Sequence, residues 1–266
     1  RAASGGLTYV PDDALFWSAA SLATILVGLA KGGFAGLVIL GMSLLSLVMA
    51  PARAAAIMLP ILMLQDVVSL WAYRRDYDSK SLRILAPGAF VGVALGAATA
   101  AYVSDAAIRI VIGVIALAFA VNALAGFGPR LARTRWASGP VAGAVWGALS
   151  GFASQVSHAG GPPLQIWILS RGLSRDAMAG TAAWYFAIVN LMKAPFFAGL
   201  GLLDRQTLLA ALVLAPLAVA ATLFGVWLVR RLPPERFFGV IYSLMLVTGA
   251  KLIYDGGHML MRGAAP

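Results

Sequence analysis

The chain has 266 residues, of which 61% are hydrophobic and 11% charged, and its formal net charge is +10 at pH 7. Soluble domains carry about 25% charged residues. This composition, with a mean hydropathy of +0.88, therefore excludes a water-soluble protein and predicts one embedded in a lipid bilayer. Cysteine is absent and two histidines occur, which excludes disulfides and cysteine metal sites; neither a metal nor a cofactor is expected.

Apolar segments recur along the whole chain. Helix is the state expected for each, because a membrane-spanning segment must satisfy its own backbone hydrogen bonds. A full span needs about 20 residues; most segments reach this length, but 162–171 is too short and 34–50 is marginal. An all-α polytopic membrane protein is predicted, with segments near 14–31, 34–50, 52–73, 83–103, 106–125, 137–157, 162–171, 174–199, 206–230 and 236–254.

The basic residues lie in alternate loops. Cytoplasmic loops of membrane proteins carry an excess of Lys and Arg, so these loops are predicted to be cytoplasmic, with both termini on the extracytoplasmic side of the cell (inner) membrane. The same arrangement explains the positive charge without a nucleic-acid partner. The residues concerned are Arg74, Arg75, Lys80, Arg83, Arg130, Arg133, Arg135, Arg171, Arg175, Arg230, Arg231 and Arg236.

The two halves of the chain resemble each other. Each contains a glycine-rich break, a short apolar run and a basic turn, and the matching positions are about 125 residues apart. Each half holds five segments, and because five is odd, the second half enters the membrane from the opposite side. The sequence predicts one transmembrane domain over 1–266, built from inverted repeats at 14–125 and 137–254. In transporters of this architecture the substrate site lies near the midplane, at the repeat interface.

The second break, at Gly160 and Gly161, predicts a re-entrant hairpin. The segment 162–171 would rise about 15 Å, half of a ~30 Å hydrocarbon core, which places the break near mid-membrane. Pro162 and Pro163 fit the first turn of the returning helix. The first break is open at this stage: the segment after it would rise about 24 Å, and it could either nearly span or tilt inward.

Half-helix N-termini carry exposed N–H groups and partial positive charge, which suits an anion. Lys31 would add a cation beside one break, and His158 a donor beside the other. Competing interpretations are close helix packing at the glycines, a Lys31 that extends to the interface, and a structural hydrogen bond at His158. The predicted substrate-binding residues are Lys31, Gly32, Gly33, Gln155, Ser157, His158, Gly160, Gly161 and Gln165.

Polar residues also occur inside two long segments that correspond to each other in the two halves. Asp66 could carry a proton, or could be a static partner of Lys31 or Lys193. Trp184 and Tyr185 could line the cavity or only pack. The predicted coupling and pathway residues are Gln65, Asp66, Asn190, Lys193, Trp184 and Tyr185.

The order and duplication of these features resemble the TauE/SafE family of sulfite and organosulfonate exporters. The stretches that carry the resemblance begin at Leu29-Ala30-Lys31-Gly32-Gly33, at Tyr73-Arg74-Arg75-Asp76 and at Leu228-Val229-Arg230-Arg231-Leu232-Pro233-Pro234-Glu235. The resemblance covers about 14–254. It implies transport of small sulfur-containing anions, or of carboxylates in some members, driven by the proton gradient. The breaks of the family hold a longer glycine run, so Lys31 and His158 alter the pocket.

The function expected is secondary active transport of a small anion, sulfite or an organosulfonate, by alternating access and in the direction of export. The expected partners are the anion, the lipid bilayer and protons as a coupling ion; a homodimer is left open. A passive anion channel and a carboxylate carrier of the same fold are the alternatives. An enzyme is not expected, because Ser154, Ser157 and His158 lack an ordering carboxylate nearby.

Overall fold

The computed structural model describes residues 13–31, 36–100, 102–126, 139–231 and 235–262. All regular secondary structure in these residues is helical, which confirms the predicted all-α class. The predicted segments correspond to ten helices; α4 begins four residues earlier than expected, and α11 continues seven residues further. The helices are α1 (Ala14–Ala30), α2 (Gly36–Val48), α3 (Pro51–Ala72), α4 (Ser79–Ala100), α5 (Asp105–Ala125), α7 (Pro140–Ser157), α8 (Gly161–Ser170), α9 (Arg175–Gly199), α10 (Arg205–Arg231) and α11 (Glu235–Met261).

Among the described residues, four helices are long and apolar enough to cross a bilayer: α3, α4, α5 and α10. Exposed leucines, valines and aromatic rings cover the outside of the helices, as on Leu212, Val213 and Trp227 of α10. Such a surface is stable against lipid and unstable against water. The chain is therefore a multi-pass helical membrane protein.

Local signals in the sequence fix where several helices begin. The side chain of Asp13 accepts a hydrogen bond from the Phe16 N–H (2.7 Å) at the start of α1. Ser104 and Ser174 cap α5 and α9 in the same way, at 3.3 Å each. Each of these oxygens satisfies an N–H group that has no partner within the helix.

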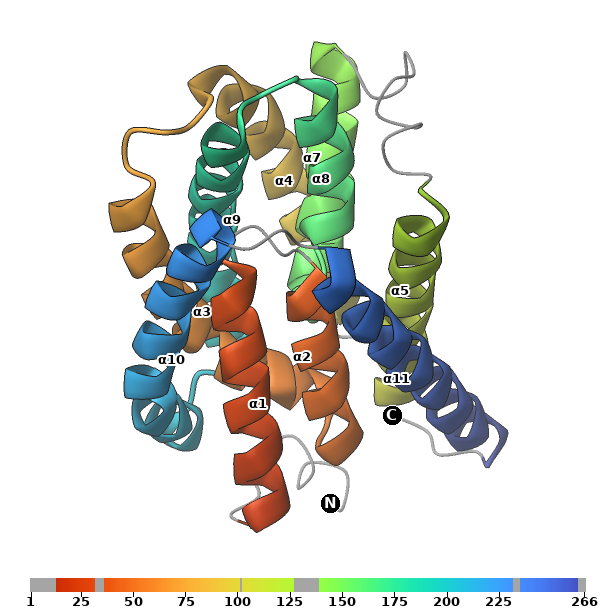
Figure 1. Cartoon of the computed structure of the whole chain (residues 1–266). Coiled ribbons are helices and arrows are strands. Elements are labelled where there is room, and N and C mark those ends of the chain that lie inside the picture. Colours follow the sequence, from red (N-terminus) through yellow and green to blue (C-terminus); the bar gives the residue numbers. More distant parts are fainter. Residues whose placement is uncertain (1–12, 32–35, 101, 127–138, 232–234, 263–266) are drawn as a thin grey trace.

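Two helical hairpins enter the molecule from opposite ends (Figure 1). The α1–α2 hairpin starts at the end where α11 finishes, and the α7–α8 hairpin starts at the end where α4 begins. The inner ends of their helices meet, because Ala30 and Leu37 of the first hairpin share a buried cluster with Ala159 of the second. The short helix α8 has ten residues and packs against α7.

Glycines allow close helix contacts at three places. Gly92 of α4 lies so near α7 that a Cβ atom there would be 2.0 Å from the Ala148 carbonyl oxygen. A Cβ on Gly28 of α1 would be 2.6 Å from the Ala221 Cβ in α10, and one on Gly113 of α5 would be 2.6 Å from the Gly249 carbonyl oxygen in α11. Small residues at such crossings let two backbones approach and gain dispersion energy.

Substitution of Gly92 by valine is expected to destabilise the protein by about 3 kcal/mol or more, because the added atoms overlap α7 backbone that cannot move aside. Thermal unfolding in detergent would measure this. Gly199→Val is the matched control, since a Cβ at Gly199 has no neighbour within 4 Å. Equal unfolding temperatures for the two variants would contradict the packing described here.

At each end of the molecule, polar contacts link a loop of one half to a helix of the other half. Arg53, at the start of α3, is 1% exposed and donates to both carboxylate oxygens of Asp204, at 2.9 and 2.7 Å. Burial raises the pKa of Asp204, but hydrogen bonds from Thr207 and Arg53 outweigh it and hold this pKa below its ordinary value. At the other end, the Asp78 N–H donates to the Thr181 hydroxyl of α9 (2.8 Å). Both α3 and α9 are thus fixed within their first two turns.

Candidate functional site

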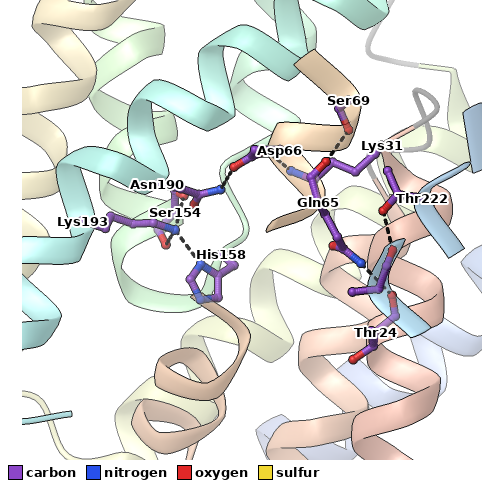
Figure 2. Close-up of polar contacts among 11 residues, drawn as sticks. Thr24, Lys31, Gln65, Asp66, Ser69, Ser154, His158, Asn190, Lys193 and Thr222 are labelled. Carbon is purple, nitrogen blue, oxygen red and sulfur yellow. Dashed lines mark hydrogen bonds and ion pairs between the residues drawn. The ribbon is translucent and has the colours of Figure 1, made fainter. Parts of the chain in front are cut away.

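The carboxylate of Asp66 is buried and extends from α3 toward the end of α1 and toward α9 (Figure 2). Asp66 of α3 forms a salt bridge with Lys31, the residue that ends α1. The other carboxylate oxygen of Asp66 accepts a hydrogen bond from the Asn190 side chain of α9 (2.6 Å). Asp66 is 3% exposed and Lys31 9%. Both oxygens of the acid are therefore held by donors in the interior of the protein.

A second polar group lies one turn further along α9. The Lys193 amine contacts the Ser154 carbonyl oxygen (3.2 Å), the Ser154 hydroxyl (3.1 Å) and His158 Nδ1 (2.5 Å). His158 Nε2 is 2.8 Å from the Ala55 carbonyl oxygen of α3. We refer to Lys31, Asp66, Asn190, Ser154, His158 and Lys193 together as the polar network.

The contacts of His158 determine how its protons are placed. A carbonyl oxygen only accepts, so the Nε2 atom beside Ala55 carries a hydrogen. A neutral imidazole then has a free lone pair on Nδ1, which faces the Lys193 amine. In this arrangement each of the three N–H groups of a charged Lys193 has a neutral acceptor.

The polar network contains more basic than acidic side chains. Asp66 is the acid that pairs with Lys31, and among the described residues no carboxylate lies within salt-bridge distance of Lys193. Lys193 is nevertheless fully buried. Charged side chains inside a membrane protein are costly unless paired or hydrated. The network therefore has two amines but one carboxylate to neutralise them.

His158 has an unusual backbone conformation at the tip of the second hairpin. Among the described residues, His158 is the one residue other than glycine that has a positive φ, of 55°. It ends α7 in the left-handed region, where its N–H reaches back to the Ala153 and Ser154 carbonyl oxygens. A non-glycine residue in this region is uncommon and typical of functional sites. The conformation directs the imidazole toward α3 and α9, and the ring stacks on Phe197 with centroids 6.2 Å apart.

The sequence matches the family described as sulfite exporter TauE/SafE over residues 20–252. The chain belongs to the TauE/SafE family. Members of this family are membrane transporters, and the family indicates export of sulfite or a related sulfur anion. Comparisons with curated proteins and with solved structures return no match.

In this TauE/SafE protein, four of the residues predicted from sequence meet in the polar network besides His158. These four are Lys31, from the first hairpin, Asp66, from α3, and Asn190 and Lys193, from α9; His158 comes from the second hairpin. Of the two predicted roles of Asp66, the contacts favour a partner of Lys31. Gln65 lies beside this group but turns to α1, where its amide donates to the Thr24 carbonyl oxygen (3.1 Å).

Other predicted residues lie outside the network. Gln155 packs against Gly96 of α4, and its buried Oε1 atom has no hydrogen-bond partner among the described residues. Ser157 donates to the Ala153 carbonyl oxygen of its own helix (3.2 Å). Gln165 is exposed on α8. None of these three side chains is among the hydrogen-bond partners of the Lys193 amine in this TauE/SafE structure.

The remaining predicted residues have structural contacts. The Tyr185 hydroxyl donates to the Gly147 carbonyl oxygen (3.2 Å), and the Trp184 ring packs on Tyr77 with centroids 5.1 Å apart. The Gly160 carbonyl oxygen accepts from the Ser150 hydroxyl (2.6 Å), which closes the turn before α8 begins at Gly161. Gly32 and Gly33 lie outside the described residues.

Sequence reasoning did not assign Ser154 to the binding site of this TauE/SafE protein, although it supplies two of the three contacts of Lys193. The spacing of residues in the sequence does point to Ser154. Ser154 and His158 are four residues apart at the end of α7, and residues with this spacing share one face of a helix. The role of Ala55 had no such signal, because its contribution is a backbone carbonyl group.

Proposed function

We propose that this protein is a secondary active transporter that exports a small sulfur anion, sulfite or an organosulfonate. The anion binds beside Lys31, Lys193 and His158, where the two hairpin tips meet. The observation that carries the proposal is the excess of buried basic side chains: Lys193 has neutral acceptors for its amine, and the nearby carboxylate of Asp66 is bound by Lys31 and Asn190.

A small oxyanion fits this chemistry. Amines, amide groups and backbone N–H groups donate hydrogen bonds, and the oxygens of sulfite or a sulfonate accept them. The Lys31 amine also lies 6.0 Å from the centre of the Phe186 ring, so an apolar surface adjoins the charged one. A sulfonate with a short organic group would contact both. Carboxylates share the acceptor oxygens and stay an alternative substrate class.

Alternating access between inverted repeats, 14–125 and 137–254, is the mechanism we propose. Two pairs of contacts support it. Helix α10 packs on α1 of the other half as α4 packs on α7, and α10 packs on α3 as α4 packs on α9. These pairs exchange when each element is replaced by its counterpart in the other half. In transporters of this class the halves rock about a site at the midplane.

Apart from the contacts of Arg53 with the loop before α10, the hydrogen bonds between α3 and the second half are few and lie at the proposed site. They include Asp66 to Asn190 and His158 to the Ala55 carbonyl group. A rocking movement of α3 against α7 and α9 would break these bonds and expose the site. In the orientation we propose, both termini are extracytoplasmic and the loop before α4 is cytoplasmic.

Purified protein in liposomes is expected to transport sulfite or a small sulfonate with saturable kinetics, and an anion that binds should raise the unfolding temperature of the protein in detergent. His158→Ala is expected to lose most of this thermal protection, because Lys193 loses a contact and its position. The matched control is His258→Ala, which lies in the last turn of α11.

Rapid, unsaturated electrical flux would favour a passive channel instead. Transport of a cation, with no binding of any anion, would contradict the proposal.

A further inference from the structure

The carboxylate of Asp66 lies where the proposed substrate would be bound. It faces donors from both halves, Lys31 and Asn190. We infer that Asp66 is a built-in competitor of the substrate: the anion binds by displacing the Asp66 carboxylate from Lys31. This inference rests on the proposed function and concerns how the affinity of the same site is set.

The contacts of Asp66 are those that a bound oxyanion would make. One oxygen pairs with an amine and the other accepts from an amide group, at 2.6 Å. A carboxylate and a sulfonate both present acceptor oxygens with delocalised negative charge, so they compete for the same donors. Lys193 lies one turn beyond Asn190 on α9. An anion that replaces the carboxylate would therefore face Lys31 and Lys193 together.

If the salt bridge between Lys31 and Asp66 were only structural, the second buried amine, Lys193, would have no explanation. A salt bridge that only neutralised Lys31 would leave Lys193 to require a carboxylate of its own, and none pairs with it among the described residues. If Asp66 neutralises Lys31 only while no substrate is bound, this explains why the network has two amines and one carboxylate. It lowers the cost of buried charge while no substrate is bound.

The competition also explains how a bound anion could leave. Two buried cations without a competitor would hold an anion tightly, because charge interactions are strong in a medium of low dielectric constant. A carboxylate that returns to Lys31 would help to release the substrate on the far side of the membrane. The empty transporter could then reorient with Lys31 already neutralised.

The test compares sulfite binding to the wild type and to Asp66→Asn by titration in detergent. The neutral amide has nearly the same shape but cannot pair with an amine as a carboxylate does, so we expect the affinity of the variant to rise at least about tenfold. Asp255→Asn is the matched control: it removes one carboxylate from an exposed pair with Lys251 and should leave the affinity unchanged. The chain has no cysteine, so sulfite has no disulfide to cleave.

Folding of the variant is itself informative. Asp66→Asn leaves Lys31 buried without an acid, so the variant should be unstable in buffer and recover when sulfite takes the place of the carboxylate. Failure to fold with and without sulfite would overturn the inference. So would an affinity of Asp66→Asn equal to or below that of a wild type that binds sulfite, and in that case the proposed function stands. Absence of binding by both proteins would overturn both.

Discussion

Replacement of Lys193 by methionine is expected to lower the affinity for sulfite by about 100-fold or more, because the variant loses a buried cation at the proposed site. The protein should still fold. Methionine is apolar and of similar length, and removing a buried charge that has no carboxylate partner lowers the desolvation cost. Stability without ligand is therefore expected to stay constant or increase, while binding is lost.

The same substitution at an exposed lysine supplies the control. Lys251 lies on α11 and pairs with Asp255 at 2.8 Å on the surface. Lys251→Met should bind sulfite as the wild type does, since exposed ion pairs contribute about 0–1 kcal/mol. Titration of both variants, with thermal unfolding of the unliganded proteins, measures affinity and stability separately. A Lys193→Met protein that is folded and binds sulfite normally would show that the anion site lies elsewhere.

Replacement of Lys31 by methionine is expected to reduce the free energy of unfolding by about 3–5 kcal/mol, because Asp66 would be left as a buried charge without a cation. This effect is opposite to that of Lys193→Met, although the two substitutions are chemically identical. The difference follows from the carboxylate: Lys31 has one as its partner, and Lys193 has neutral acceptors.

The double variant Lys31→Met/Asp66→Asn separates charge from packing. It removes both buried charges at once, so most of the stability lost in Lys31→Met should return. Binding of sulfite should not return, because the cation is still absent. Unfolding of the three proteins in a denaturant series would measure this. If the double variant were as unstable as Lys31→Met, the loss would come from the shape of the lysine side chain and not from the unpaired acid.

The helices could be predicted from the sequence because each depends on a local property. Apolar length and the glycine breaks located the ten helices of the described residues, including the short α8. The differences lie at the ends. Helix α4 starts at Ser79 because Asp78 accepts hydrogen bonds from the Lys80 and Ser81 N–H groups, at 3.2 Å each. This capping lies in a polar stretch outside the apolar run, so a search for apolar segments misses it.

The partners within the site could not be predicted, because they depend on contacts between distant segments. Sequence reasoning named Lys31 and Lys193 as alternative partners of Asp66, but it could not choose between them. Lys31 is 35 residues from Asp66, and Asn190 is 124 residues away. Helical periodicity shows which residues share a face of one helix. It does not show which face of α7 meets α9, and this decides that Ser154 and His158 contact Lys193 while Gln155 packs on α4.

The central claim is that the anion binds at the meeting point of the two hairpins, between Lys31 and Lys193. An experimental structure with selenite, the selenium analogue of sulfite, tests it most directly, because the anomalous signal of selenium locates the anion independently of the protein density. We expect one strong peak within hydrogen-bond distance of the Lys31 and Lys193 amines, with the Asp66 side chain turned away from Lys31. A peak confined to the arginines of the surface loops, with the Lys31–Asp66 salt bridge intact, would contradict it.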